Sequence, residues 1–114
     1  MGKYQLGEFE EIVLLTVGVL YNEAYGVSIK FSIEERLKRS VSVGALQSAL
    51  KRLEQKGYVT SRAGEVTNDR GGRPKRYFEL TPTGKAAIDY ARDLRNQLYS
   101  EIPQVIMDLK PNKS

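Results

Sequence analysis

The sequence of 114 residues contains neither cysteine nor histidine. Without cysteine, the chain has no disulfide framework and no thiolate ligands for a metal ion. Without histidine, it lacks the commonest general base of enzymes and the commonest metal ligand. No pair of carboxylates stands apart from the predicted helix surfaces to take over acid–base chemistry. We therefore expect neither an enzyme, nor a metal site, nor a bound cofactor.

A long hydrophobic run is also missing. The longest apolar stretch, Ile12 to Leu20, is interrupted by Thr16 and Gly18 and is too short to span a bilayer. The first residues do not show the basic and then apolar pattern of a signal peptide. The sequence therefore predicts a cytoplasmic protein with no membrane segment. Its length and its 40% hydrophobic residues suit one domain with a modest core.

Positive charge is concentrated in the middle of the chain. Residues 1–35 hold two basic and six acidic side chains, residues 36–85 hold twelve and four, and residues 86–114 hold four of each. The three segments contribute −4, +8 and zero to the net charge of +4. A basic central segment is typical of a surface that binds nucleic acid, although a solvated basic face would have the same composition.

Apolar residues at helical spacing predict three helices in the first half of the chain, over residues 6–21, 25–38 and 43–56. Ser42 is a suitable N-cap for the third helix, and Gly57 is a suitable terminator. Leu46, Leu50 and Leu53 lie on one face of this helix and are assigned to the core. The short turn before it gives the second and third helices the spacing of a helix-turn-helix.

Two strands, over residues 58–62 and 76–80, are predicted to form a hairpin. Phe78 alternates with polar neighbours and is assigned to the hairpin's core. The connection between the strands is rich in cations and in turn-forming residues, which are Asn68, Asp69, Gly71, Gly72 and Pro74. The hairpin therefore has a long, basic tip.

A last helix is predicted to begin at Thr81-Pro82, with the threonine as N-cap and the proline in the first turn. Its apolar residues have the spacing of a short coiled-coil seam and are Ala87, Ala91, Leu94 and Leu98. Pro103 is expected to kink or end this helix. Apolar burial is expected to resume around and beyond it, at Ile102, Val105, Ile106 and Leu109.

The order of these elements predicts a mainly α fold with a β-hairpin wing, which is an α+β winged helix-turn-helix followed by a dimerisation helix. We assign residues 1–81 to the DNA-binding domain and residues 82–109 to the C-terminal dimerisation region. Residues 110–114 are assigned to a disordered tail.

The third helix and the wing are the predicted DNA-binding elements. The helix suits the major groove, and the basic wing suits the backbone or the minor groove. The expected contact residues are Ser42, Gly44, Gln47, Ser48, Lys51 and Arg52 of the helix and Arg70, Arg73, Lys75 and Arg76 of the wing. Capping alone explains Ser42 equally well, and a role within its own strand is the alternative for Arg76. Tyr25, next to Gly26, is interpreted as a packing residue.

The seam of the last helix could pack on its own domain or on a second copy of the chain. Because three helices and a hairpin already close a small domain, we expect a two-fold homodimer. The expected interface residues are Phe9, Val13, Ala87, Ala91, Leu94 and Leu98. Such a dimer would hold two recognition helices about 34 Å apart, one turn of DNA, and would bind a palindromic operator of double-stranded DNA.

Four stretches in this order resemble the PadR family of bacterial transcriptional regulators: LGEFEEIVLLTVGVL at 6–20, AYGVSI at 24–29, VGALQSALKRLEQKGYV at 43–59 and GGRPKRYFELTPTGK at 71–85. The resemblance implies a dimeric DNA-binding repressor of the short-tailed type, with a single C-terminal helix. The family usually has a tyrosine at the position of Gln47. A glutamine can bond a phosphate or an adenine edge, but it lacks the packing of the ring.

Some relatives in this family bind flat apolar ligands between the helices of the dimer. Because this chain has no tryptophan, a tryptophan-walled pocket is excluded. A smaller pocket for an apolar effector could be lined by Phe9, Val13, Tyr90 and Leu94, although plain interface packing is the stronger interpretation. A winged helix that binds RNA or protein is the remaining alternative. The basic wing argues against a purely protein partner, and the deep major groove of RNA does not admit a helix.

Overall fold

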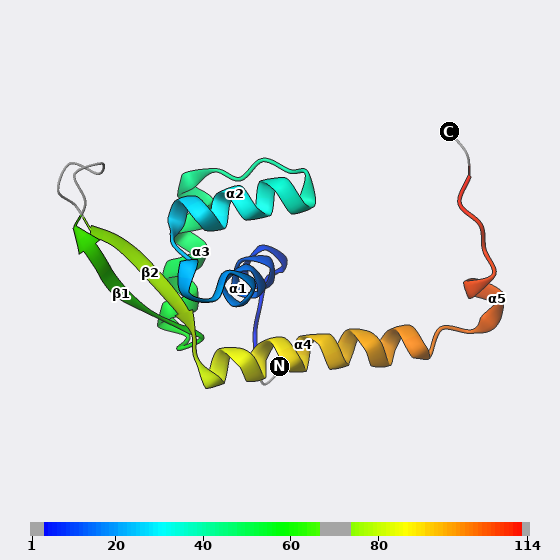
Figure 1. The fold of residues 1–114 in the computed structure, drawn as a ribbon. Helices are drawn as coiled ribbons and strands as arrows, with labels where there is room; N and C mark the ends of the chain where they lie inside the picture. Colours follow the sequence, from blue (N-terminus) through cyan, green and yellow to red (C-terminus); the bar gives the residue numbers. More distant parts are fainter. Residues whose placement is uncertain (1–3, 67–73, 113–114) are drawn as a thin grey trace.

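The structure is a computed structural model that describes residues 4–66 and 74–112. Three helices, α1 (Glu8–Leu20), α2 (Gly26–Leu37) and α3 (Val43–Gln55), precede a hairpin of β1 (Val59–Val66) and β2 (Pro74–Leu80). The long helix α4 (Pro82–Ser100) and the single turn α5 (Gln104–Met107) follow, and the 3₁₀ turn η1 (Tyr21–Glu23) joins α1 to α2. This order confirms the predicted winged helix-turn-helix (Figure 1). None of the helices within these residues has an apolar stretch of the length that a bilayer requires.

The ends of α3 and α4 are set by the residues that the sequence indicated. The Ser42 hydroxyl accepts a hydrogen bond from the Ala45 amide at 3.1 Å, which caps the start of α3. Gly57, with a φ of +80°, lets the chain turn away after α3. At the start of α4, the Thr81 hydroxyl accepts from the Gly84 amide at 2.9 Å. These local signals explain why the predicted boundaries lie close to the observed ones.

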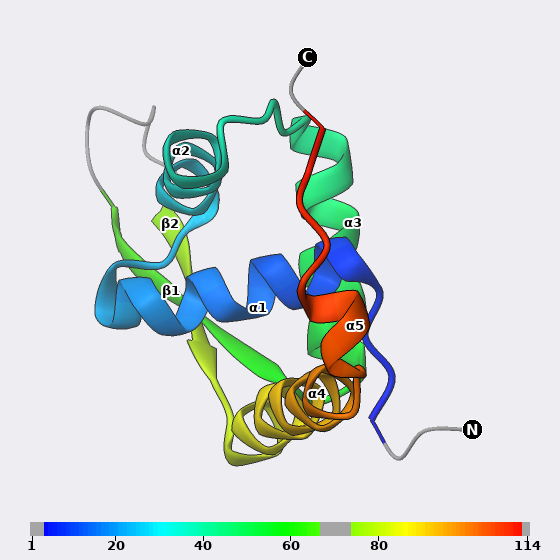
Figure 2. The same ribbon diagram turned by 90° about the vertical axis from the view of Figure 1, so that its right-hand side faces the viewer.

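The core lies around α1, which runs through the centre of the domain between α2, α3 and α4 (Figure 2). Leu46, Leu50 and Leu53 of α3 are each at most 2% exposed, which confirms their assignment to the core. From α2, Ile29 and Ile33 are buried against the same centre. The side of α3 opposite these leucines is therefore left for other contacts.

The two strands pair antiparallel, with one irregularity between Ala63 and Val66. Both strands extend further toward the tip of the hairpin than predicted. Pro74 is the first residue of β2. A proline has no backbone N–H to donate to the neighbouring strand, and it is tolerated at the first position of a strand. Phe78 is buried, as expected, and closes the hairpin onto the helices.

The middle of β2 is joined to the start of α2 through the backbone. Tyr25 forms an isolated antiparallel bridge with Tyr77, and the Phe78 amide donates to the Ala24 carbonyl oxygen at 2.8 Å. These contacts join segments that are about fifty residues apart in the sequence. They fix the direction of the wing relative to the helix-turn-helix.

Helix α4 and the hairpin leave the domain in opposite directions (Figure 1). The first turns of α4 pack tightly on the domain: a Cβ at Gly84 would lie 2.1 Å from the Tyr58 carbonyl oxygen, and Ala87 is completely buried. The break at Pro103 is confirmed, since α4 ends at Ser100 and α5 begins at Gln104. Between Pro103 and residue 112, where the described part of the chain ends, no apolar side chain is buried, which contradicts the expectation. Val105, Ile106 and Leu109 are all exposed, because α4 carries them away from the domain.

The first turn of α1 is acidic, and each of its three carboxylates pairs with a cation of a different part of the fold. The pairs are Glu8 with Arg39, Glu10 with Arg52 and Lys56, and Glu11 with Arg95. Arg39 lies in the turn before α3, Arg52 lies in α3 and Arg95 lies in α4. One turn of α1 therefore connects the helix-turn-helix to the C-terminal helix.

Candidate nucleic-acid interface

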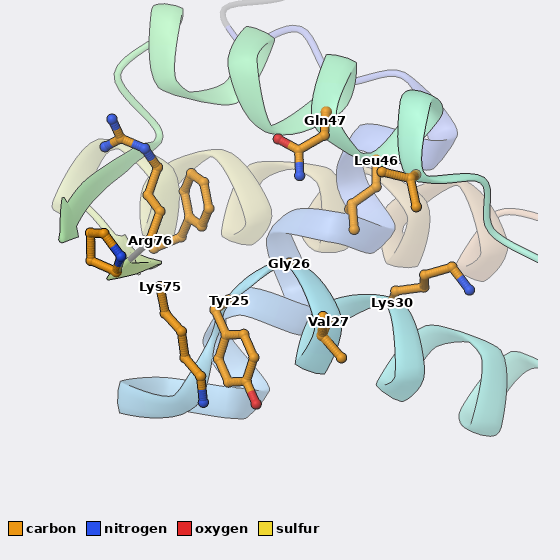
Figure 3. A pocket seen from close by; sticks show the side chains of 11 residues that line it. Tyr25, Gly26, Val27, Lys30, Leu46, Gln47, Lys75 and Arg76 are labelled. Atoms are coloured by element: carbon orange, nitrogen blue, oxygen red, sulfur yellow. The ribbon is translucent and has the colours of Figure 1, made fainter. Parts of the chain in front are cut away.

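A hollow of about 340 Å³ lies between the first turns of α2 and α3 and the beginning of β2 (Figure 3). Residues of all three elements line it, and they are Tyr25, Gly26, Val27, Lys30, Val43, Leu46, Gln47, Pro74, Lys75, Arg76 and Phe78. The floor is apolar, since Leu46 and Phe78 are core residues. The polar and cationic side chains at the rim come from the two elements that the sequence assigned to DNA binding, and from α2.

The open side of α3 faces solvent next to this hollow. Gln47 and Ser48 are exposed, and a Cβ at Gly44 would meet no atom within 4 Å. Gln47 projects from α3 toward the start of α2, where a Cβ at Gly26 would lie 3.6 Å from its Nε2 atom (Figure 3). Lys51 is exposed one turn further on and has no hydrogen bond or ion pair within the described residues. Small and polar side chains thus line the approach to this helix.

The Arg52 side chain, unlike that of Lys51, is directed toward α1. Its Nε atom donates to a carboxylate oxygen of Glu10 at 2.7 Å, so the guanidinium is held against α1. Ser42 likewise uses its hydroxyl as the cap of α3. These two predicted contact residues therefore make contacts within the chain. The other four predicted contact residues of α3 are exposed to solvent, and they are Gly44, Gln47, Ser48 and Lys51.

The wing brings two cations to the hollow. Arg76 is exposed, and its Nη1 atom donates to the Ser61 hydroxyl at 2.8 Å. The Lys75 ammonium lies 4.2 Å from the centre of the Tyr25 ring. Among the side chains that the structure describes (residues 4–64 and 74–112), no carboxylate forms an ion pair with Lys75 or Arg76. The predicted contact residues Arg70 and Arg73 lie outside the described residues.

Sequence reasoning missed the contribution of α2 to this surface. Lys30 lines the hollow and pairs with Glu34 at 3.1 Å. The Glu34 carboxylate also accepts from the Val41 amide, and this bond and the Lys30 ammonium hold the pKa of Glu34 below its usual value. Tyr25 reaches the hollow only because it pairs with β2. The dipeptide Tyr25-Gly26 at the start of a helix is a weak signal on its own.

The predicted dimer residues fall into two groups. Val13 and Ala87 are completely buried in the core of their own chain, so they are not available to a second copy. The apolar face of α1 that includes Val13 is covered by the domain's own helices. Phe9 is partly buried beneath the Arg39 guanidinium. Further along α4, Leu94 and Leu98 are 45% and 59% exposed. The free part of the seam is therefore the outer half of α4.

A second hollow, of about 320 Å³, lies along α4 where the N-terminal segment crosses it. Tyr90, Leu94 and Leu98 line it from α4, and the Tyr4 ring stands 5.6 Å from the Tyr90 ring. Of the residues named for an effector pocket, Tyr90 and Leu94 lie here, whereas Phe9 and Val13 do not line this hollow.

The family model for the transcriptional regulator PadR-like family matches residues 14–90 of the chain. Three solved structures show how similar the fold is. A PadR-like transcription factor from Bacteroides fragilis is 25% identical, with 81% of this chain and 84% of that chain covered and a TM-score of 0.69. A PadR family transcription regulator from Clostridium difficile is 22% identical over 86% and 98% of the two chains, with a TM-score of 0.65.

The third structure is a PadR-like transcriptional regulator from Bacillus cereus, which is 13% identical, covers 90% of this chain and 93% of that chain, and has a TM-score of 0.69. At these identities the last two structures show the fold alone. No curated protein sequence matches the chain significantly.

Proposed function

This chain belongs to the PadR-like family of transcriptional regulators, and from that premise we propose that it is a homodimeric repressor that binds a palindromic operator. The family regulates transcription through DNA and does not consist of enzymes, in agreement with the absence of histidine and cysteine. We expect it to act in the cytoplasm, where bacterial DNA is accessible to it.

The observation that supports this proposal best is the hollow that Gln47 of α3 shares with Lys75 and Arg76 of the wing. An α-helix fits the major groove of DNA, and glutamine is a good partner for an adenine edge. Cations beside that helix would contact the phosphates that border the groove. A single stretch of duplex would then meet both elements at once.

The homodimer is proposed through the outer half of α4. Ala91, Leu94 and Leu98 lie along one seam there, and the two leucines are exposed in the single chain. Two-fold symmetry would pair this seam with the same seam of a second copy, and this contact would bury the two leucines. The dimer would then present two copies of α3 to successive turns of DNA. The hollow beside Tyr90 and Leu94 would then border the interface, with room for a small apolar effector.

Selection from a random library of duplex DNA tests this function with the full chain. We expect a two-fold symmetric site with half-sites about one turn apart, and an affinity that falls steeply with salt concentration. Insertion of the selected site into a promoter should lower expression of a reporter gene. A chain that ignores duplex DNA at low salt, or that prefers duplex RNA in competition, would contradict the proposal.

A further inference from the structure

Four side chains contact one another in a row where the wing meets the start of α2; we call this row the stack, and its two tyrosine rings are tilted by 58° to each other. The Lys75 ammonium lies 4.2 Å from the centre of the Tyr25 ring, and the Tyr25 and Tyr77 rings are 5.4 Å apart. On the far side, the Arg62 guanidinium lies 4.8 Å from the centre of the Tyr77 ring. Each cation therefore rests on the face of a tyrosine, which attracts positive charge.

The backbone holds this stack in place. Tyr25 and Tyr77 are bridge partners, and the neighbouring Phe78 amide donates to the Ala24 carbonyl oxygen. Tyr25 is also the N-cap residue of α2, and its amide donates to the Ser28 hydroxyl at 2.9 Å. Main-chain contacts therefore hold the two tyrosines at positions from which their rings meet.

The two ends of the stack differ in charge. At one end, Arg62 is neutralised by Glu79, with 3.0 Å between Nε and a carboxylate oxygen. At the other end, Lys75 has no carboxylate partner, and the Tyr25 hydroxyl makes no hydrogen bond, among the described side chains, which are those of residues 4–64 and 74–112. The hydroxyl and the ammonium extend in the same direction at the rim of the hollow (Figure 3). This end presents two hydrogen-bond donors and one uncompensated positive charge.

We propose that Tyr25 and Lys75 together bind one phosphate of the DNA backbone, an inference that rests on the proposed function. The ligand is a phosphodiester, since a single negative charge with several acceptor oxygens matches one ammonium and one hydroxyl. Tyr25 thus has two tasks: its hydroxyl donates to the phosphate, and its ring holds the Lys75 ammonium beside it. Tyr25 is a DNA-contact residue, and not only the packing residue suggested by the sequence.

The test compares Tyr25→Phe with Lys75→Gln in the full chain, by titration of the selected duplex at several salt concentrations. Tyr25→Phe keeps the ring and removes one donor, so we expect affinity for every sequence to fall by about threefold to tenfold. Its salt slope should stay the same, because a neutral hydroxyl releases no counterion. Lys75→Gln should lower the salt slope by about one unit. The double variant should lose less than the product of the single losses, because both side chains contact one phosphate.

Tyr21→Phe is the matched control, because Tyr21 is an exposed tyrosine in η1 and does not line this hollow. It should bind DNA like the unchanged chain. Thermal unfolding of each variant shows whether it is folded. If the unchanged chain binds duplex DNA and Tyr25→Phe binds it equally well, the phosphate site is refuted while the proposed function stands. If the unchanged chain does not bind duplex DNA at low salt, the proposed function itself fails.

Discussion

Replacement of Glu10 by glutamine should destabilise the fold, because Glu10 is a nearly buried carboxylate that holds α1 to α3. Its oxygens accept hydrogen bonds from Arg52 Nε and Lys56 Nζ, both at 2.7 Å, and from the Gly7 amide at 3.3 Å. The residue is only 8% exposed. A glutamine of the same shape keeps one acceptor oxygen, but it turns an amide group toward one of the two cations.

The size of the effect follows from these contacts. A hydrogen bond to a charged group contributes roughly 1.5–3 kcal/mol when it is buried. The cations here are partly in water, with 54% of the Arg52 side chain and 31% of the Lys56 side chain exposed, so solvent replaces part of each interaction. We therefore expect a loss of about 1–2 kcal/mol in the free energy of unfolding, and a fall in Tm on the order of 5 °C.

Urea unfolding followed by circular dichroism, at a fixed protein concentration, measures this difference. Burial raises the pKa of Glu10, but the hydrogen bonds from Lys56 and Arg52 outweigh it and hold the pKa below the ordinary value of 4.5. A carboxyl whose pKa is lowered by folding stabilises the protein fully above its unfolded value, and this contribution is lost as the pH falls through the folded value. The gap between the two proteins should therefore be constant near pH 7 and should close below about pH 4.5.

Glu8→Gln is the control, because Glu8 is an exposed carboxylate of the same helix turn that pairs with Arg39 at 3.5 Å. It should change the free energy of unfolding by less than about 0.5 kcal/mol. An equal loss in both variants would mean that helix charge, and not the buried contact to α3, determines stability. A Glu10→Gln protein as stable as the unchanged chain at pH 7 would refute the reasoning altogether.

Three further predictions concern DNA binding and assembly. Lys51→Ala should weaken DNA binding by about as much as the loss of one phosphate or base contact, and it should leave Tm unchanged. Arg52→Ala should instead lower Tm and leave the salt slope of binding nearly unchanged, because Arg52 is paired with Glu10. The reverse pattern would show that Arg52 leaves Glu10 to contact DNA. Gln47→Ala should change the sequence preference by about 1–3 kcal/mol at one position of a selected library, and a uniform loss across the library would argue against base readout. Leu94→Lys should give monomers in analytical ultracentrifugation that bind the palindrome poorly, and a stable dimer would place the interface elsewhere.

Elements with local signals could be predicted from the sequence. Ser42, Gly57 and Thr81 act on backbone groups within a few residues, so the helix ends followed from short patterns. The leucine stripe of α3 also identified the open side of that helix.

Long-range contacts could not be predicted in the same way. A stripe shows that Val13 is apolar, but not that it would be covered by its own chain and not by a second copy. The pairing of Arg52 with Glu10 joins residues 42 positions apart, and only the packing of α3 on α1 reveals it. Tyr25 reached the candidate site for a similar reason, since it depends on its bridge to Tyr77.

The acidic first turn of α1 has a mechanical consequence for an assembled regulator. Glu10 pairs with α3, the proposed recognition helix, and Glu11 pairs with α4, the proposed dimerisation helix, so one turn of α1 contacts both. In the proposed homodimer, the distance between the two copies of α3 would therefore be fixed. One base pair added to the spacer of an operator turns one half-site by about a tenth of a helical turn. The dimer could follow this rotation only if ion pairs of the first turn of α1 broke. Operators of this protein should therefore tolerate changes in sequence better than changes in spacing.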